Sequence, residues 1–366
     1  MSELLRDVLR ERAAVPPPVF DAAGLVTRAE RRIRRRRLIG VVAAVVVMAV
    51  VAAGLVLVPR LHDDPAPVDR PARFVEHRLT YVQAGVVHYG NQTFDTGVLA
   101  VMALARTPYG FLLATYSGNV WFSDGSTAEK VGLDVAARHS SAVTADATGP
   151  LAAWVETADD GVAELVVYDS RRAVVVARVS GGPADEAAPP DVVAVDDQAV
   201  YWSQRPGTGD PLLRYDVATG EQEAVDLPSL AYVADVADGV FAYGTSDLGA
   251  YRVVVASPRA RSTIEGLLMF DADLSPDGSY LAGHGRRGLG VFEVATGQQV
   301  SLQPPRGYGA HQFMGWVDRN TVAVWDHYKF TILTCAVPSG SCQVAVQDPG
   351  DPGVWRPLFP EGYQPG

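Results

Sequence analysis

Two patterns of apolar residues divide this chain. Residues 38–58 read LIGVVAAVVVMAVVAAGLVLV, an unbroken apolar run without a charged side chain or a proline. From about Leu79 to Asp348 the pattern changes to short alternating runs of Val, Ala, Tyr, Trp and Phe, separated by Gly, Pro and Asp. Alternation with period two, broken by turn residues, is typical of β-strands. The chain therefore predicts one long helix followed by a large all-β region.

The apolar run has the length of a membrane span. A helix of ~20 residues rises roughly 30 Å, the thickness of the hydrocarbon core of a bilayer. A cleavable signal peptide is the rival interpretation, but such peptides have an apolar core of ~7 to 15 residues and a small-residue cleavage site. Here a long leader precedes the run and VPRLHDD follows it. We therefore predict one N-terminal transmembrane helix over residues 38–58 that is retained.

Charge beside the run predicts its orientation. Basic residues stand directly before it: Arg31, Arg32, Arg34, Arg35, Arg36 and Arg37. After it, the first basic residue, Arg60, is soon followed by Asp63 and Asp64. Positive charge beside a spanning helix stays in the cytoplasm. We therefore expect a single-pass protein of the cell membrane with a cytoplasmic N-terminus and an extracytoplasmic C-terminal domain.

These features divide the chain into four parts. Residues 1–37 form a basic cytoplasmic leader, residues 38–58 the transmembrane helix, residues 59–73 a Pro-rich spacer, and residues 74–366 the ectodomain. Within the leader, residues 2–14 carry apolar side chains at helical spacing. This segment either docks into a groove of a cytoplasmic partner or belongs to a leader that only sets the topology.

Composition narrows the partners of the ectodomain. The chain has a net charge of -11; residues 1–37 hold ten Arg and five acidic residues, so the remainder carries -16. Such an acidic domain argues against nucleic acid or anionic lipid as its partner. The Ala, Val, Gly and Pro content, with Arg in place of Lys, is typical of a high-GC bacterial genome.

The all-β region contains an internal repeat. YDVATGE (215–221) and FEVATGQ (292–298) are 77 positions apart, about twice 38. A turn followed by an apolar strand also recurs, as in SPDG before SYLAG and VDRN before TVAVW, at intervals of roughly 40 residues. Four strands per unit at a period of ~40 to 45 residues predict a β-propeller.

The repeat units predict the number of blades. Six units span residues 98–347, and residues 79–97 hold only two or three strands. The missing strand would come from the C-terminus, where residues 353–359 are the candidate. We predict an all-β propeller of seven blades, with six or eight as alternatives.

A resemblance rests on DADLSPDGSYLA (271–282) followed by GVFEVATGQ. This segment resembles the repeat of WD40, TolB-like and YVTN-type propellers, and it implies a divergent bacterial propeller. Trp325-Asp326 stands at the end of a predicted second strand, whereas WD40 repeats carry this dipeptide on the third. The overall layout is similar to that of actinobacterial single-pass membrane proteins with a propeller outside.

The two cysteines belong to one short segment. Cys335 and Cys342 flank Pro338-Ser339-Gly340, and the residues on either side are β-rich. This pattern predicts a hairpin. In an oxidising exterior, the two cysteines should form a structural disulfide.

The sequence carries no catalytic motif that we recognise. The G-x-S-x-G, H-E-x-x-H, Walker A and Rossmann patterns are absent, so we expect a protein that is not an enzyme and has no cofactor and no metal site. In a propeller, the loop entering the innermost strand and the loop after the second strand lie on one face. On that face we predict a ligand patch made of His139, His284, Arg286, His311, His327 and Tyr328. The alternative is that the histidines are scattered over the surface and form no site.

These expectations lead to two functions. The first is a membrane-anchored extracytoplasmic propeller that acts as a binding or sensory module for an envelope protein, peptide or glycan. The alternative is an anchored lyase or hydrolase that uses the channel face.

Overall fold

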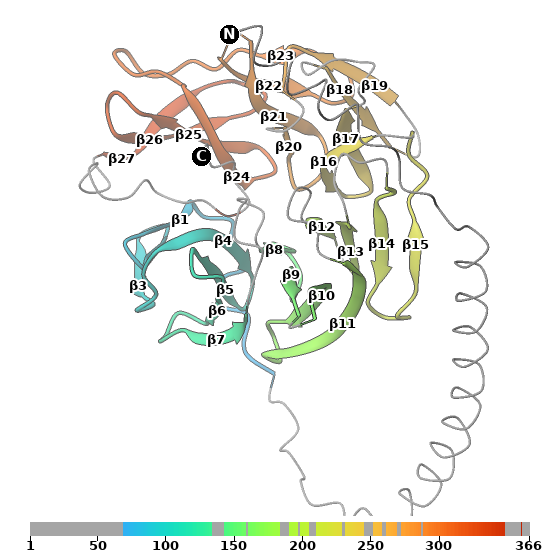
Figure 1. Ribbon diagram of the computed structural model, residues 1–366. Coiled ribbons are helices and arrows are strands. Elements are labelled where there is room, and N and C mark those ends of the chain that lie inside the picture. Colours follow the sequence, from blue (N-terminus) through green and yellow to red (C-terminus); the bar gives the residue numbers. More distant parts are fainter. Residues whose placement is uncertain are drawn as a thin grey trace, which may run out of the picture. The chain divides into compact units, whose positions relative to one another are not determined.

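The computed structural model (Figure 1) describes parts of the chain between residues 69 and 360. The described residues are 69–133, 143–158, 160–183, 190–196, 198–204, 210–228, 231–244, 252–257, 261–268, 272–286, 288–347 and 360. The predicted leader, the predicted transmembrane helix 38–58 and most of the spacer lie outside them. Within these ranges, no helix has the length and apolarity that crossing a membrane requires.

The described chain forms antiparallel sheets, each built from strands that follow one another in sequence. The first sheet has three strands: β1 (Thr80–Gln83), β2 (Val86–Tyr89) and β3 (Gln92–Asp95). The next three sheets have four strands each: β4 (Val101–Thr107), β5 (Gly110–Thr115), β6 (Val120–Ser123), β7 (Glu129–Gly132); β8 (Thr144–Ala145), β9 (Leu151–Thr157), β10 (Val162–Asp169), β11 (Val174–Pro183); β12 (Asp191–Asp196), β13 (Ala199–Ser203), β14 (Leu213–Asp216), β15 (Gln222–Ala224).

The remaining three sheets repeat the same order. Their strands are β16 (Tyr232–Ala237), β17 (Val240–Gly244), β18 (Arg252–Ala256), β19 (Arg261–Glu265); β20 (Asp273–Leu274), β21 (Tyr280–Gly285), β22 (Gly288–Glu293), β23 (Gln299–Val300); β24 (Gln312–Asp318), β25 (Thr321–Asp326), β26 (Thr331–Ala336), β27 (Cys342–Gln347). These sheets are the blades of a seven-bladed β-propeller (Figure 1), which confirms the predicted fold and blade number.

Apolar packing between neighbouring blades holds the ring together. The buried side chains fall into seven clusters, and each cluster is shared by two adjacent blades. Trp154 and Trp202, both fully buried on second strands, lie in two successive interfaces. Because strand residues alternate between the two faces of a sheet, each blade supplies side chains to both neighbours.

The smallest set of contacts closes the ring between the seventh blade and the first. Tyr81 of β1 packs with Met314, Trp325 and Ile332 of the seventh blade. All four side chains are buried, and Trp325 exposes 5% of its surface. Closure therefore depends on side-chain packing between these two blades.

The first blade is incomplete within the described residues, and the missing position is the innermost one. Its first strand β1 is buried, whereas β3 is mostly exposed, as are the outer strands of the other blades. The predicted closing segment, residues 353–359, lies outside the described residues. Directly after it, Pro360 forms a parallel bridge with Leu104 of β4, the innermost strand of the second blade.

Strand direction defines two faces of the propeller. Since neighbouring strands are antiparallel, the loop before each innermost strand and the loop after each second strand share one face. We call this the entry face. It carries the loops before β4 and β24 and those after β5, β21 and β25.

The repeated heptapeptides occupy one structural position. YDVATGE connects β14 to β15 in the fourth blade, and FEVATGQ connects β22 to β23 in the sixth. Gly220 N donates to Asp216 O, and Gly297 N donates to Glu293 O, each at 2.8 Å. Both glycines have a positive φ, +73° and +68°, which glycine adopts without a steric penalty. The separation of 77 residues is therefore the distance between alternate blades.

Residues assigned to the spacer already contact the propeller. Arg70 N donates to Arg171 O, and Arg73 N donates to Pro108 O. The Arg70 guanidinium also pairs with Asp124 and Glu129. The chain is thus attached to the second and third blades before residue 74.

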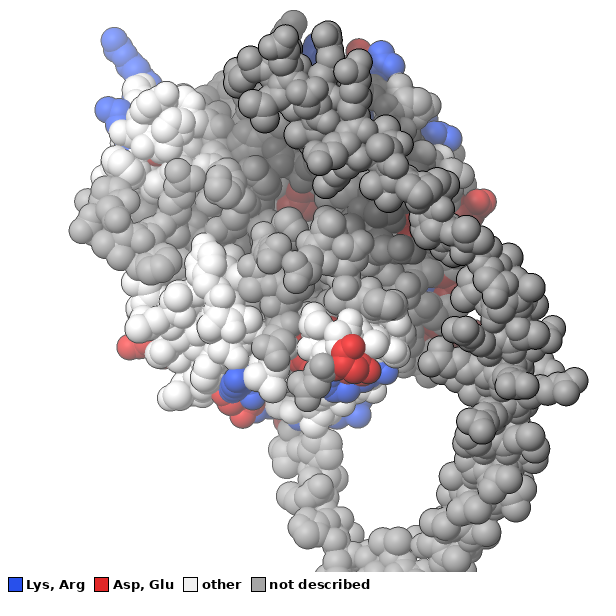
Figure 2. All heavy atoms as spheres, in the orientation of Figure 1, with Lys and Arg blue, Asp and Glu red and all other residues white. Residues whose placement is uncertain are grey.

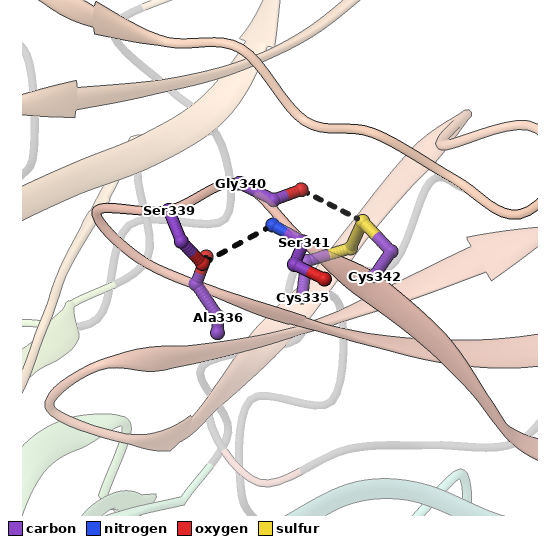
Figure 3. Close-up of a disulfide and its surroundings, with 6 residues drawn as sticks. All are labelled: Cys335, Ala336, Ser339, Gly340, Ser341 and Cys342. Atoms are coloured by element: carbon purple, nitrogen blue, oxygen red, sulfur yellow. Dashed lines mark hydrogen bonds between the residues drawn. A yellow bond between two sulfur atoms is a disulfide. The ribbon is translucent and has the colours of Figure 1, made fainter.

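The predicted disulfide is present between β26 and β27 (Figure 3). Cys335 and Cys342 are directly opposite each other in the antiparallel pair, with their Cα atoms 4.0 Å apart. Cys335 is fully buried and packs in the cluster between the sixth and seventh blades. The turn residue Ser341 donates its N–H to Ser339 Oγ. The disulfide therefore fastens the outermost strand of the seventh blade.

Replacing the closing tryptophan should weaken the whole ring. Trp325→Ala removes a buried side chain from the smallest interface, and truncation of a buried aromatic residue costs about 3–5 kcal/mol. Urea unfolding of the purified protein measures this loss. Tyr116→Ala, which truncates an aromatic residue that is 62% exposed, is the control and should change stability by less than ~0.5 kcal/mol. Equal losses in the two variants would contradict the role of this interface.

Removing the disulfide should cost less than breaking the ring. For so short a loop the chain-entropy relation gives about 2.5 kcal/mol. The Cys335→Ser/Cys342→Ser variant should therefore still fold, with its urea midpoint lowered accordingly, and reductant should lower the midpoint of the wild type but not of the variant. A variant as stable as the wild type would rule out a stabilising role.

Candidate functional site

The site lies on the entry face of the seventh blade, where β25 ends. Asp326 is the last residue of β25, and its side chain is only 2% exposed. Its Oδ2 accepts a hydrogen bond from Gly309 N at 2.8 Å. Its Oδ1 accepts from Tyr328 N at 3.0 Å and from Lys329 N at 3.1 Å. One carboxylate thus joins the loop that enters β24 to the loop that leaves β25.

These two loops bring three aromatic rings together. The ring centroids of His311 and His327 are 4.9 Å apart, those of His311 and Tyr328 are 5.0 Å apart, and those of His327 and Tyr328 are 4.0 Å apart. We call these three residues the His–Tyr cluster. Tyr328 is 73% exposed, so the cluster presents an aromatic surface to solvent.

The buried carboxylate also sets the electrostatics of the cluster. Burial alone would raise the pKa of Asp326. The three backbone N–H donors and the neighbouring His311 outweigh burial, so the pKa of this carboxyl is lower than its ordinary value. Asp326 Oδ1 lies 3.8 Å from His311 Nε2, which makes an ion pair when His311 is protonated. The cluster can therefore carry neutral or cationic imidazole over a fixed negative charge.

A glycine leaves room for His311. A Cβ atom on Gly309 would lie 2.1 Å from His311 Nε2, closer than any real contact. A larger residue at position 309 would therefore displace the ring or the loop.

The other predicted patch residues are distributed differently. His284 is in β21 of the sixth blade, with Arg286 directly after that strand, so both belong to the entry face. His284 O accepts from Leu268 N, and Arg286 N donates to Gly266 O. His139 lies outside the described residues. The structure thus brings together His311, His327 and Tyr328.

Two residues of the site did not stand out in the sequence. Asp326 organises both loops, and Phe330 is 40% exposed beside Trp325, with ring centroids 6.3 Å apart. The sequence feature that could have indicated this site is HYKF (327–330), which has three ring-bearing residues in four positions directly after a buried strand.

More apolar surface lies on the same face in the second blade. Leu99 precedes β4 and is 72% exposed, Tyr116 follows β5, and Leu133 follows β7. The second and seventh blades are the two neighbours of the first blade. In the view of Figure 2, the described atoms on the left are mostly uncharged, and charged side chains of both signs gather along the lower edge.

Comparisons with known proteins found matches among solved structures. No protein-family model matches the chain, and no curated protein matches it. Among solved structures, a chain of the mitotic checkpoint complex is 16% identical with a TM-score of 0.48, over 81% of this chain and 89% of that one. TolB from Acinetobacter baumannii is 15% identical with a TM-score of 0.44, over 63% and 64%. BamB from Moraxella catarrhalis is 16% identical with a TM-score of 0.40, over 67% and 75%.

The seven sheets of the ring make the protein a β-propeller. The similarities to solved structures carry no functional argument, so the function is argued from the site.

Removing the charge of Asp326 should loosen both loops in a pH-dependent way. Because the pKa of Asp326 is lowered in the folded protein, its contribution to stability is complete above the ordinary value of about 3.9 and is lost as the pH falls through the folded value. Asp326→Asn should therefore be less stable than the wild type at pH 7, by about 1–3 kcal/mol. Thermal unfolding between pH 7 and pH 3 should show this difference shrinking with acid. A difference that is constant across the range would contradict the role of the charge.

Proposed function

We propose that this protein is a membrane-anchored binding module whose propeller takes up a protein or peptide partner outside the cytoplasm. The partner contacts the His–Tyr cluster and Phe330 on the entry face. The observation that carries this proposal is an exposed aromatic surface held in place by a buried carboxylate. Aromatic side chains on a fixed support are typical of the residues that dominate binding energy in protein interfaces.

The backbone of the loop supports a binding role. Phe330 has φ +48°, a left-handed conformation that disfavours a bulky residue. Holding a residue there costs on the order of 1–3 kcal/mol, and such residues concentrate at functional sites. The same side chain is 40% exposed, so the strain is not offset by full burial.

The extent of the apolar surface favours a macromolecular partner. Leu99, Tyr116 and Leu133 extend the exposed apolar residues to the second blade. Scattered single apolar residues are ordinary on protein surfaces, but several on one face of the second and seventh blades, on either side of the first, favour an interaction site.

Two features support an extracytoplasmic location of the propeller and a membrane anchor. The Cys335–Cys342 disulfide is typical of proteins in oxidising, extracytoplasmic environments. The apolar run 38–58 after a basic leader favours a single span with the N-terminus inside. If the protein also transmits a signal across the membrane, residues 2–14 would have to bind a cytoplasmic partner.

Tyr328→Ala should reduce partner capture. The full-length tagged protein, solubilised in mild detergent, is used to recover partners, which are quantified by mass spectrometry. Loss of a dominant interface residue costs about 2 kcal/mol or more, roughly a thirtyfold change in affinity. A true partner should therefore be depleted with Tyr328→Ala and retained with Val175→Ala, which alters an exposed apolar residue on the outer strand of the third blade. Identical recoveries with both variants would refute the proposed surface.

A further inference from the structure

Charge is distributed unevenly over the entry face. In the sixth and seventh blades its loops carry exposed basic residues, Arg286 after β21, Arg306 before β24 and Lys329 after β25. Exposed acidic residues on this face stand in other blades, such as Asp160 after β9 and Asp226 after β15. The sixth and seventh blades therefore present a positive region in a domain that is negative overall.

Lys329 stands on an ordered backbone between two exposed rings. Its N–H donates to Asp326 Oδ1 at 3.1 Å, and its carbonyl accepts from Thr331 Oγ1 at 2.9 Å. The residues on either side of it, Tyr328 and Phe330, are 73% and 40% exposed. Because the loop is ordered before a partner arrives, binding here loses little further conformational entropy of the backbone.

Arg306 lies in a turn of the adjoining loop. Tyr308 N closes this turn by donating to Pro305 O at 3.0 Å. One residue further on, Gly309 N donates to Asp326 Oδ2 at 2.8 Å. The buried carboxylate of Asp326 therefore joins the loop of Arg306 to the loop after β25.

These two charges are not neutralised by a described residue. Neither Arg306 nor Lys329 forms an ion pair within the described ranges. The acidic group between their loops, Asp326, is 2% exposed and already accepts three backbone N–H groups. By contrast, Arg252 of the fifth blade pairs with Glu265 at 2.9 Å. Two cations of the seventh blade are thus available to carboxylates from outside the chain.

Local charge decides which groups this surface can pair with. At physiological ionic strength, charges in water are largely screened beyond roughly 8 Å. A bound segment therefore meets the basic side chains nearest to it more strongly than the net charge of the domain. The exposed rings beside these charges provide apolar contact at the same place.

We propose that the entry face of the seventh blade recognises an acidic segment of a protein partner. Carboxylates of the segment pair with Arg306 and Lys329, and a neighbouring apolar side chain packs on the His–Tyr cluster. This inference rests on the proposed binding function and adds the chemistry of the partner. A peptide fits better than a nucleic acid, since the rings take apolar side chains and a densely charged polyanion is repelled by the acidic domain.

A synthetic peptide tests the charge requirement. The probe is a labelled peptide of Glu and Leu residues, and its counterpart has Gln in place of each Glu. Both are titrated against the full-length protein in nonionic detergent. The wild type should bind the Glu peptide at least about fivefold more tightly than the Gln peptide, a factor that a few exposed ion pairs supply.

Two variants locate the binding charges. Arg306→Gln/Lys329→Gln should lose the preference for the Glu peptide. Arg319→Gln should keep it, because Arg319 is an exposed arginine of the same blade in the β24–β25 hairpin, on the opposite face. Raising the salt concentration from about 50 mM to about 500 mM should remove most of the difference between the double variant and the wild type. Equal urea midpoints check that the fold is retained.

The outcomes separate this inference from the binding function itself. A wild type that does not distinguish the two peptides, or a preference that survives in the double variant, would overturn the acidic partner. Binding of inorganic polyphosphate but not of the Glu peptide would assign the surface to a phosphate ligand and would overturn it as well. If Tyr328→Ala loses a captured partner that the double variant retains, the aromatic contact surface stands and the acidic segment does not.

Discussion

Each blade of this protein has two faces, and each face must be covered by a neighbouring blade. Apolar side chains on alternate strand positions meet this requirement through seven shared clusters that run round the whole ring. No blade has a complete core of its own, so the ring is the unit that folds. Because the packing is satisfied within the sheets, the loops on the entry face are left to carry other chemistry.

The buried Asp326 illustrates how the surroundings decide what a carboxyl does. It receives three backbone N–H groups and stands next to His311, so it organises two loops. This arrangement fixes a surface on one blade.

Much of the fold could be predicted because local patterns repeat. The VATG turn recurs, and the backbone hydrogen bonds of Gly220 and Gly297 show that its two copies are the same element in alternate blades. The disulfide was predictable from two cysteines flanking turn residues.

For the innermost position of the first blade, the sequence offered only a candidate, residues 353–359, which lies outside the described residues. The candidate site was predictable in part. Propeller topology places His311 and His327 on one face, but whether their rings touch depends on the bonds from Asp326 to both loops. Such long-range contacts leave no periodic signal.

The central claim is that the His–Tyr cluster is the contact surface for a partner outside the cytoplasm. A photo-crosslinking amino acid at position 328 of the full-length protein, activated in intact cells, tests it most directly. The account predicts a discrete crosslinked product with an extracytoplasmic protein, absent when the same amino acid is placed at position 175. No product at position 328, or the same products from both positions, would contradict it.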